Sequence, residues 1–416
     1  MGFTLIRFFT EVKVLKLKLT ELNSGYEGYG NIPRFSDKAK SKMIIAGVLV
    51  GVFVFVYILS TIGIIPLDAI SARVTTFVTN DSENFPIQTN TNSTIAIKTI
   101  GDNILILTTE NFVVFSQKGN EIYNQPHSFA SPAVSINGNK AVVFDRGDRG
   151  YYLITDKKVV SNGEADGDII CAEYGKTGNY AFGTRATDAT SKITVYSVTN
   201  KVIFQWNSAY DHITSIALAG NGKYAGVCIL GAENGEIFSC VQYFGFDYAE
   251  PINTQKINGV TAFDLEFTAT NTLTLFTDEG VFTIGKKEEK YETVAEYFSS
   301  EFNSFDCADN GKYVVAIAKY GSANNYQISV YNERGKLKSE IKAEYTIKSV
   351  TMSDKYVFAL AENSLLVYNL SGHKIGEITI DGEAYSVCPT DKYAYVSSLN
   401  KLSRCYSFGE STLEIS

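Results

Sequence analysis

Two cysteines, Cys228 and Cys240, have a spacing that could support covalent chemistry. They are equidistant from Asn234, which lies in a Gly-bounded turn at 231–235. In a symmetric hairpin they would face each other, close enough to bond if that pair is not hydrogen-bonded. A shift of one residue in register breaks the pairing. We therefore treat Cys228 and Cys240 as a candidate disulfide, and we expect Cys171, Cys307 and Cys388 to be packing thiols near the centre of the fold.

No residue set in the chain has the spacing of a catalytic or metal site. Glu164, Asp166 and Asp168 share a Gly-containing loop but lack the alternation of a calcium loop, so a solvated surface loop is the better interpretation. The only three histidines fall in different parts of the chain, and phosphate-loop, Gly-x-Ser-x-Gly and Cys-x-x-Cys motifs are absent. We expect no catalytic residue, no cofactor, no metal and no convergent carboxylates. Arg146-Gly147-Asp148 is interpreted as part of a charged hairpin turn. The histidines are His127, His212 and His373.

A membrane segment precedes these residues in the chain. Residues 43–65 carry no charge, and 15 of the 23 are Ile, Val, Leu or Phe. A helix of this length rises about 34 Å, enough to cross the hydrocarbon core of a bilayer. Four of the five charged residues in 34–42 are basic, so the positive-inside rule places the N-terminus in the cytoplasm. A cleaved signal peptide is the alternative, but the apolar core and the leader are both too long.

The charge differs on the two sides of this segment. Residues 1–42 hold eight Lys and Arg against four Asp and Glu, a net charge of +4, whereas the rest holds 29 basic against 41 acidic residues, a net charge of −12. A basic tail suits an anionic inner leaflet, either as a membrane-surface helix or as a disordered segment. The acidic remainder argues against nucleic acid as a partner.

The part that follows the membrane segment repeats a short phrase. A turn with Gly or Asp, often Lys, then Tyr and an apolar run occurs in five clear copies and three degenerate ones. The spacing averages about 41 residues, the period of a four-stranded propeller blade. The phrase predicts an all-β, eight-bladed β-propeller, with seven blades as the fallback. Its anchors are Ile104, Ala141, Tyr180, Tyr224, Leu273, Tyr313, Tyr356 and Tyr393, and the Tyr side chains should pack between blades.

The segments 349–356 and 215–227 resemble WD40-like and quinoprotein-like propeller repeats. Val-Tyr-Asn triplets such as 330–332 and 367–369 stand where a WD40 repeat has Trp-Asp, although no copy has the Gly-His dipeptide. The resemblance implies a propeller over about 93–408. The whole layout also resembles an uncharacterised bacterial family of single-span proteins with extracytoplasmic propellers, which implies location and fold only.

Ring closure requires a partner for the short last repeat. Residues 73–78 are rich in β-formers, and we expect this segment to pair with Leu402 to Phe408 as the outer strand of the last blade. Thr412 to Ile415 is the competitor. The expected organisation is a basic cytoplasmic tail (1–42), a transmembrane helix (43–65), a juxtamembrane segment with the closure strand (66–92) and the propeller (93–416).

These features predict a membrane-anchored, extracytoplasmic propeller that is not an enzyme. It would bind or scaffold a protein or an envelope polymer. A quinoprotein-like enzyme that uses the channel mouth, or a purely structural envelope component, is the alternative. First strands offer mainly small residues at equivalent positions, which blade packing explains better than catalysis. These are Cys171, Ser215, Ser304, Ser349 and Ser386.

Overall fold

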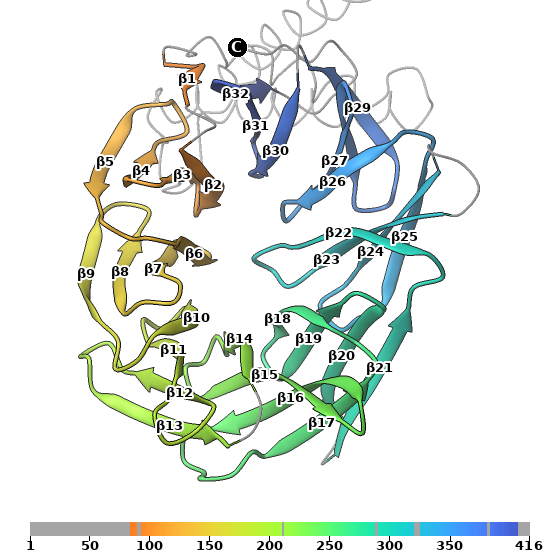
Figure 1. Ribbon diagram of the computed structural model, residues 1–416. Coiled ribbons are helices and arrows are strands. Elements are labelled where there is room, and N and C mark those ends of the chain that lie inside the picture. Colours follow the sequence, from red (N-terminus) through yellow and green to blue (C-terminus); the bar gives the residue numbers. More distant parts are fainter. Residues whose placement is uncertain are drawn as a thin grey trace, which may run out of the picture. The chain divides into compact units, whose positions relative to one another are not determined.

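Eight four-stranded antiparallel sheets make up the part of the chain that the structure describes. This computed structural model describes residues 84–89, 93–209, 212–287, 290–319, 325–380 and 383–406. The sheets are the blades of a β-propeller, arranged around a central axis (Figure 1). The predicted all-β, eight-bladed fold is confirmed, and all eight anchors lie in second strands.

Each blade runs from an inner strand at the axis to an outer strand at the rim. The inner strands are β2 (Thr94–Ile100), β6 (Pro132–Asn137), β10 (Ile169–Tyr174), β14 (His212–Leu218), β18 (Ala262–Ala269), β22 (Glu301–Cys307), β26 (Ile347–Met352) and β30 (Ala384–Pro389). The second strands are β3 (Asn103–Thr108), β7 (Lys140–Asp145), β11 (Tyr180–Arg185), β15 (Tyr224–Glu233), β19 (Thr272–Thr277), β23 (Tyr313–Ala318), β27 (Tyr356–Ala361) and β31 (Tyr393–Ser398). The third strands are β4 (Asn111–Phe115), β8 (Gly150–Thr155), β12 (Ser191–Tyr196), β16 (Glu236–Gly245), β20 (Gly280–Lys287), β24 (Tyr326–Tyr331), β28 (Ser364–Asn369) and β32 (Lys401–Tyr406). The outer strands are β5 (Glu121–Pro126), β9 (Val159–Glu164), β13 (Val202–Ser208), β17 (Asn253–Asn258), β21 (Lys290–Tyr297), β25 (Leu337–Ala343), β29 (Lys374–Thr379) and β1 (Ile87–Gln88).

The hydrophobic core lies between neighbouring blades, because each sheet has two apolar faces that only another blade can cover. Anchor tyrosines take part in this packing. Tyr180 is 2% exposed and its ring stacks on Tyr196 at 5.0 Å between centroids. Tyr313, 1% exposed, stacks on Tyr331 at 4.8 Å and meets Phe276 of the preceding blade at 5.4 Å. The repeated Tyr is therefore part of the core.

The last blade is completed from the N-terminal side of the ring. Strand β1 pairs antiparallel with β32, with Ile87 opposite Leu402, and the amide of Thr89 donates to the carbonyl of Asn400 at 2.9 Å. Ile87 is 8% exposed, so the short strand also contributes to the core. The ring thus begins before the predicted boundary at residue 93, and the predicted segment 73–78 is not the strand that the structure pairs with Leu402.

Several predicted segments lie outside the described residues. They are 1–42, 43–65, 73–78 and 412–415. Within the described ranges, the chain forms no helix long and apolar enough to cross a membrane.

Candidate functional site

A cavity of about 1700 Å³ occupies the centre of the ring. It is lined by residues of all eight inner strands, which surround the axis in Figure 1. Hydrogen bonds join equivalent positions of neighbouring inner strands. The Ser304 hydroxyl accepts from the Val350 amide at 3.0 Å, and Asp306 accepts from the Met352 amide at 2.8 Å. These strands therefore run in the same direction, so the channel has two chemically distinct ends.

At one end, where the inner strands begin, seven of the eight blades carry a β-bulge in the described residues. The extra residue is the second of the inner strand in five of them (Ile95, Ile170, Phe263, Lys348 and Tyr385) and the third in two (Thr214 in β14 and Asn303 in β22). A bulge leaves one residue unpaired and redirects its side chain. We call this end the bulge face.

Large apolar side chains are exposed on the bulge face. Ile95 is 49%, Phe263 48% and Tyr385 48% exposed, and all three line the channel. Leu399, 55% exposed, lies in the β31–β32 turn at the same end and lines the channel as well. Phe263 also contacts Phe302 of the next blade, with ring centroids 5.0 Å apart. Ile95, Tyr385 and Leu399 belong to the adjacent first and last blades, and Phe263 belongs to the fifth, across the ring from Ile95. Apolar groups exposed at a cavity mouth are typical of an interaction site.

Carboxyl groups line the channel, four on inner strands and five in turns, and cations outside the lining compensate some of them, as Lys355 does for Asp391. The lining contains nine Asp and Glu residues and only two cationic residues, Lys98 and Arg146. The expectation that carboxylates do not converge is therefore wrong. Several of them share a repeat position. Glu173, Glu266 and Asp306 each pair with the residue that follows the anchor of the second strand. Asp102, Asp354 and Asp391 each stand two residues before an anchor. The nine acidic residues are Asp102, Asp156, Glu173, Asp264, Glu266, Asp306, Asp309, Asp354 and Asp391.

Burial raises the pKa of several of these groups. It raises the pKa of Glu173 to about 7, although hydrogen bonds from Ser135 (2.6 Å) and Asn137 (2.8 Å) oppose the shift. It raises the pKa of Asp306 to about 6. For Glu266, burial and the negative charges of Asp264 and Glu173 all act in the same direction, and its pKa lies well above the usual range.

The carboxylates differ in how they are held. Glu173 is almost fully buried and bonded to the preceding blade, whereas Asp264, Glu266 and Asp306 keep part of their surface open to the channel. Asp264 accepts from the Ser215 hydroxyl at 3.0 Å and from the Leu265 amide at 2.8 Å. Among the described residues, Glu266 has no hydrogen-bond or ion-pair partner and borders the channel directly. The positive charge of Lys176 opposes the rise of its pKa, but Lys176 does not pair with Glu266 directly.

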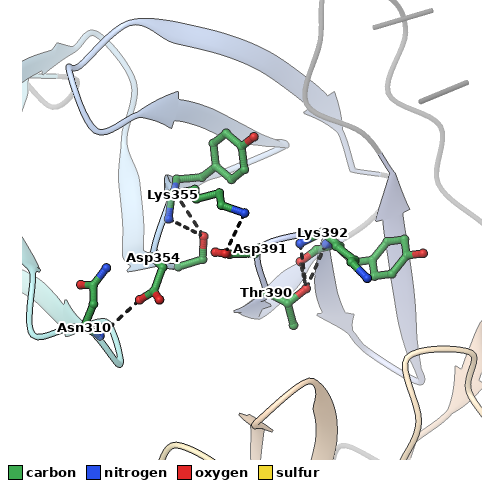
Figure 2. Close-up of polar contacts among 9 residues, drawn as sticks. Asn310, Asp354, Lys355, Thr390, Asp391 and Lys392 are labelled. Atoms are coloured by element: carbon green, nitrogen blue, oxygen red, sulfur yellow. Dashed lines mark hydrogen bonds and ion pairs between the residues drawn. The ribbon is translucent and has the colours of Figure 1, made fainter. Parts of the chain in front are cut away.

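The opposite end, where inner and second strands join, is cross-linked by polar contacts; we call it the turn face. The Lys176 ammonium donates to the Asp309 carbonyl at 3.1 Å, which joins the third and sixth blades. Figure 2 shows further links between successive turns. The backbone amide of Asn310 donates a hydrogen bond to the Asp354 carboxylate at 3.2 Å, and the Lys355 ammonium forms an ion pair with Asp391 at 3.1 Å. The repeated turn residues therefore connect blades.

The candidate disulfide between Cys228 and Cys240 is not formed. In the β15–β16 hairpin Cys228 faces Val241 and Cys240 faces Ile229, so the register differs by one residue from the symmetric hairpin. The two side chains lie on opposite faces of the sheet, and neither cysteine takes part in a disulfide. The other three thiols named above line the channel as expected, and burial raises their pKa.

The remaining sequence candidates are not brought together. The His127 ring lies 4.9 Å from Phe129 and contacts the carbonyl of Thr108 at 3.1 Å, while His212 and His373 belong to other blades. In the acidic loop, Asp166 pairs with Lys192, and Asp168 lies 3.8 Å from Arg149. No group of three metal-ligating side chains occurs in the described ranges.

The match to known families decides where this chain belongs. Residues 78–403, most of the chain, match a family of unknown function, DUF5711. The chain belongs to the DUF5711 family. Its match begins just before β1 and ends within β32, so it coincides with the closed ring described above. No curated protein matches the chain by sequence.

Solved structures share the fold of this DUF5711 protein at low sequence identity. The C-terminal WD40 domain of Sif2 has a TM-score of 0.56 at 10% identity, covering 78% of this chain and 97% of that one. A eukaryotic initiation factor has a TM-score of 0.50 at 10% identity, with 77% and 87% covered. BamB from Moraxella catarrhalis has a TM-score of 0.45 at 12% identity, with 76% and 99% covered. The WD40-like resemblance is confirmed as a likeness of fold.

Proposed function

We propose that this DUF5711 protein is a membrane-anchored, extracytoplasmic binding module that engages a partner protein through its bulge face. One observation supports the binding role above the others: Ile95, Tyr385 and Leu399 expose apolar side chains on the adjacent first and last blades at the mouth of a large cavity, and Phe263 does so on the fifth blade. Exposing them to water is unfavourable by roughly 25 cal/mol per Å² of apolar surface, which a partner would remove.

We further propose that the module is not an enzyme. The small polar residues of the inner strands are engaged in joining blades, as Ser215 is with Asp264 and Ser304 with Val350. The Cys388 thiol contacts the Ile97 carbonyl of the first blade at 2.9 Å. A nucleophile needs an adjacent base and a third group that orients the base. The contacts of these residues hold neighbouring blades together and do not form a series of nucleophile, base and orienting group.

The location rests on the sequence. The uncharged segment 43–65 and the basic residues of 34–42 place the propeller on the far side of the membrane from the N-terminus. The strand β1, which closes the ring, follows this segment in the chain, so the seam of the propeller is its attachment point to the proposed anchor.

Site-specific photocrosslinking of the full-length protein in its native membrane tests the binding role. A photoreactive phenylalanine analogue replaces Phe263 or Tyr385 on the bulge face, or Val160 on the outer strand β9 as the control, which is 46% exposed. We expect a discrete protein adduct from the two bulge-face positions. Adducts from position 160 alone, or from no position, would contradict the proposed function.

A further inference from the structure

The bulge face and the channel behind it differ in chemistry. The rim is apolar at Ile95, Phe263, Tyr385 and Leu399, and the channel that opens within it is acidic. Asp264 directly follows the bulged residue Phe263, and Glu266 stands two residues further along β18. A ligand that enters through the rim therefore meets apolar side chains first and the carboxyl groups of Asp264 and Glu266 next.

A cationic side chain would pair with carboxyl groups of the channel that have no ion-pair partner among the described residues. Glu266 lacks a hydrogen-bond or ion-pair partner among the described residues, and the nearby negative charges of Asp264 and Glu173 disfavour its ionised form. Four carboxylic acids stand on the inner strands, and among the described residues of the lining Lys98 and Arg146 are the only cations. A positive charge between these groups would be stabilised by several carboxylates at once, in surroundings that screen it less than bulk water does.

We infer that the partner presents a Lys or Arg side chain flanked by apolar residues, and that this cation enters the channel from the bulge face toward Asp264 and Glu266. The inference rests on the proposed function and adds the chemical class of the partner segment. The flanking apolar residues cover Phe263 and Tyr385, which excludes water from the ion pairs behind them. A neutral or acidic segment would leave the carboxylates buried without compensation.

The turn face does not offer the same entry. Its inner turns are joined across the axis by Lys176 and Asp309 and around the ring by Asn310, Lys355 and their Asp partners. A segment that enters there would have to break these contacts, whereas the bulge face carries exposed side chains that a partner only covers. The direction of entry therefore follows from the two ends of the channel.

The test combines crosslinking with removal of the channel charge. The full-length protein with the photoreactive analogue at position 385 is crosslinked in its native membrane, and the adducted partner peptide is identified by mass spectrometry. Glu266→Gln with Asp264→Asn removes two acidic groups, which can pair with a cation as carboxylates, at nearly constant volume. Glu236→Gln, at an exposed position outside the channel, is the matched control. We expect the double variant to reduce the adduct about tenfold and the control to leave it unchanged.

A second probe uses the captured segment itself. A synthetic peptide of that segment, and the same peptide with its Lys or Arg replaced by norleucine, are titrated against the full-length protein in detergent by fluorescence anisotropy. We expect the norleucine peptide to bind at least tenfold more weakly, and the difference to shrink at high salt. A captured segment without Lys or Arg, or equal binding of the two peptides, would overturn the inference but leave the proposed function intact. Absence of any adduct at positions 263 and 385 would overturn both.

Discussion

The Lys176 ammonium lies 3.1 Å from the carbonyl oxygen of Asp309, although 133 residues separate the two positions. The contact spans the turn face between the third and sixth blades. The charge of Lys176 also lowers the pKa of Glu173, Glu266 and Asp309, against the larger effect of burial. This single lysine is thus both a link across the ring and a source of compensation for the acidic channel.

Replacing Lys176 should make stability more sensitive to pH. Lys176→Met removes the cross-channel hydrogen bond, which at an exposed ammonium should cost about 0.5 kcal/mol. It also lets the pKa of the channel carboxyl groups rise further, so the free energy of unfolding should fall more steeply between pH 5 and 8. Urea unfolding of the soluble propeller at several pH values measures this. Lys157→Met, at an exposed turn position, should behave like the wild type; equal slopes for both variants would contradict the prediction.

Glu173→Gln should stabilise the propeller at neutral pH. The folded-state pKa of Glu173, about 7, is above its ordinary value of 4.5, so the folded state binds a proton that the unfolded state releases. The stabilisation is fully present below pH 4.5 and is lost as pH rises through 7. Gln needs no proton, so above pH 7 the variant should be more stable by on the order of 2 kcal/mol.

The same urea series checks this prediction with Glu164→Gln as the control. Glu164 is exposed at the end of β9, and the identical change there should leave the pH profile unaltered. Asp306, with a pKa of about 6, should retain part of the slope in both variants. A Glu173→Gln profile that runs parallel to the wild type would show that Glu173 does not titrate in this range.

The closure strand should be required for full stability. A propeller that begins at residue 84 keeps β1, whereas one that begins at residue 93 leaves the last blade with three strands and exposes the outer edge of β32. Within the longer form, Ile87→Ala should cost about 2–4 kcal/mol, because Ile87 is 8% exposed and packs in the core. Gln88→Ala, next to it but exposed, should cost little. Equal urea midpoints for the two truncations would contradict this role.

Gly311→Ala should be among the most destabilising single changes. Gly311 has φ +79°, and a Cβ atom there would lie 1.8 Å from the Thr268 carbonyl oxygen of the preceding blade, so backbone has to move. We expect a loss above 3 kcal/mol. Gly147→Ala shares the positive φ (+90°) but meets nothing within 4 Å, and should cost only about 1–2 kcal/mol. Similar losses at the two positions would show that backbone strain alone accounts for the effect.

The repeat predicted the fold because its signal is periodic and strong. The anchor position is Tyr in five of the eight second strands, as at Tyr180 and Tyr313, and apolar in the other three. The register of the β15–β16 hairpin was harder to predict. A shift of one residue in its pairing moves Cys240 to the opposite face of the sheet from Cys228, and the composition of the hairpin does not reveal this shift. The two-residue closure strand at Ile87 is likewise too short to give a pattern.

The candidate site was hidden for a related reason. A bulge inserts one residue, so Phe263 and Tyr385 leave no mark on the alternation of their strands. The channel carboxylates come from several blades, and only ring closure brings Glu173 near Asp264 and Glu266. Exposed apolar residues at the second position of inner strands are the signal that could have pointed to the bulge face.

The central claim is that the propeller stands outside the membrane with its bulge face accessible. Labelling of intact spheroplasts with a membrane-impermeant maleimide tests it most directly, because the native thiols are buried or enclosed by the channel and give a low background. Tyr385→Cys reports on the bulge face and Ser24→Cys on the N-terminal tail, with the unsubstituted protein as control. We predict that Tyr385→Cys is labelled before lysis and Ser24→Cys only after it. Labelling of Tyr385→Cys only after lysis would contradict the account.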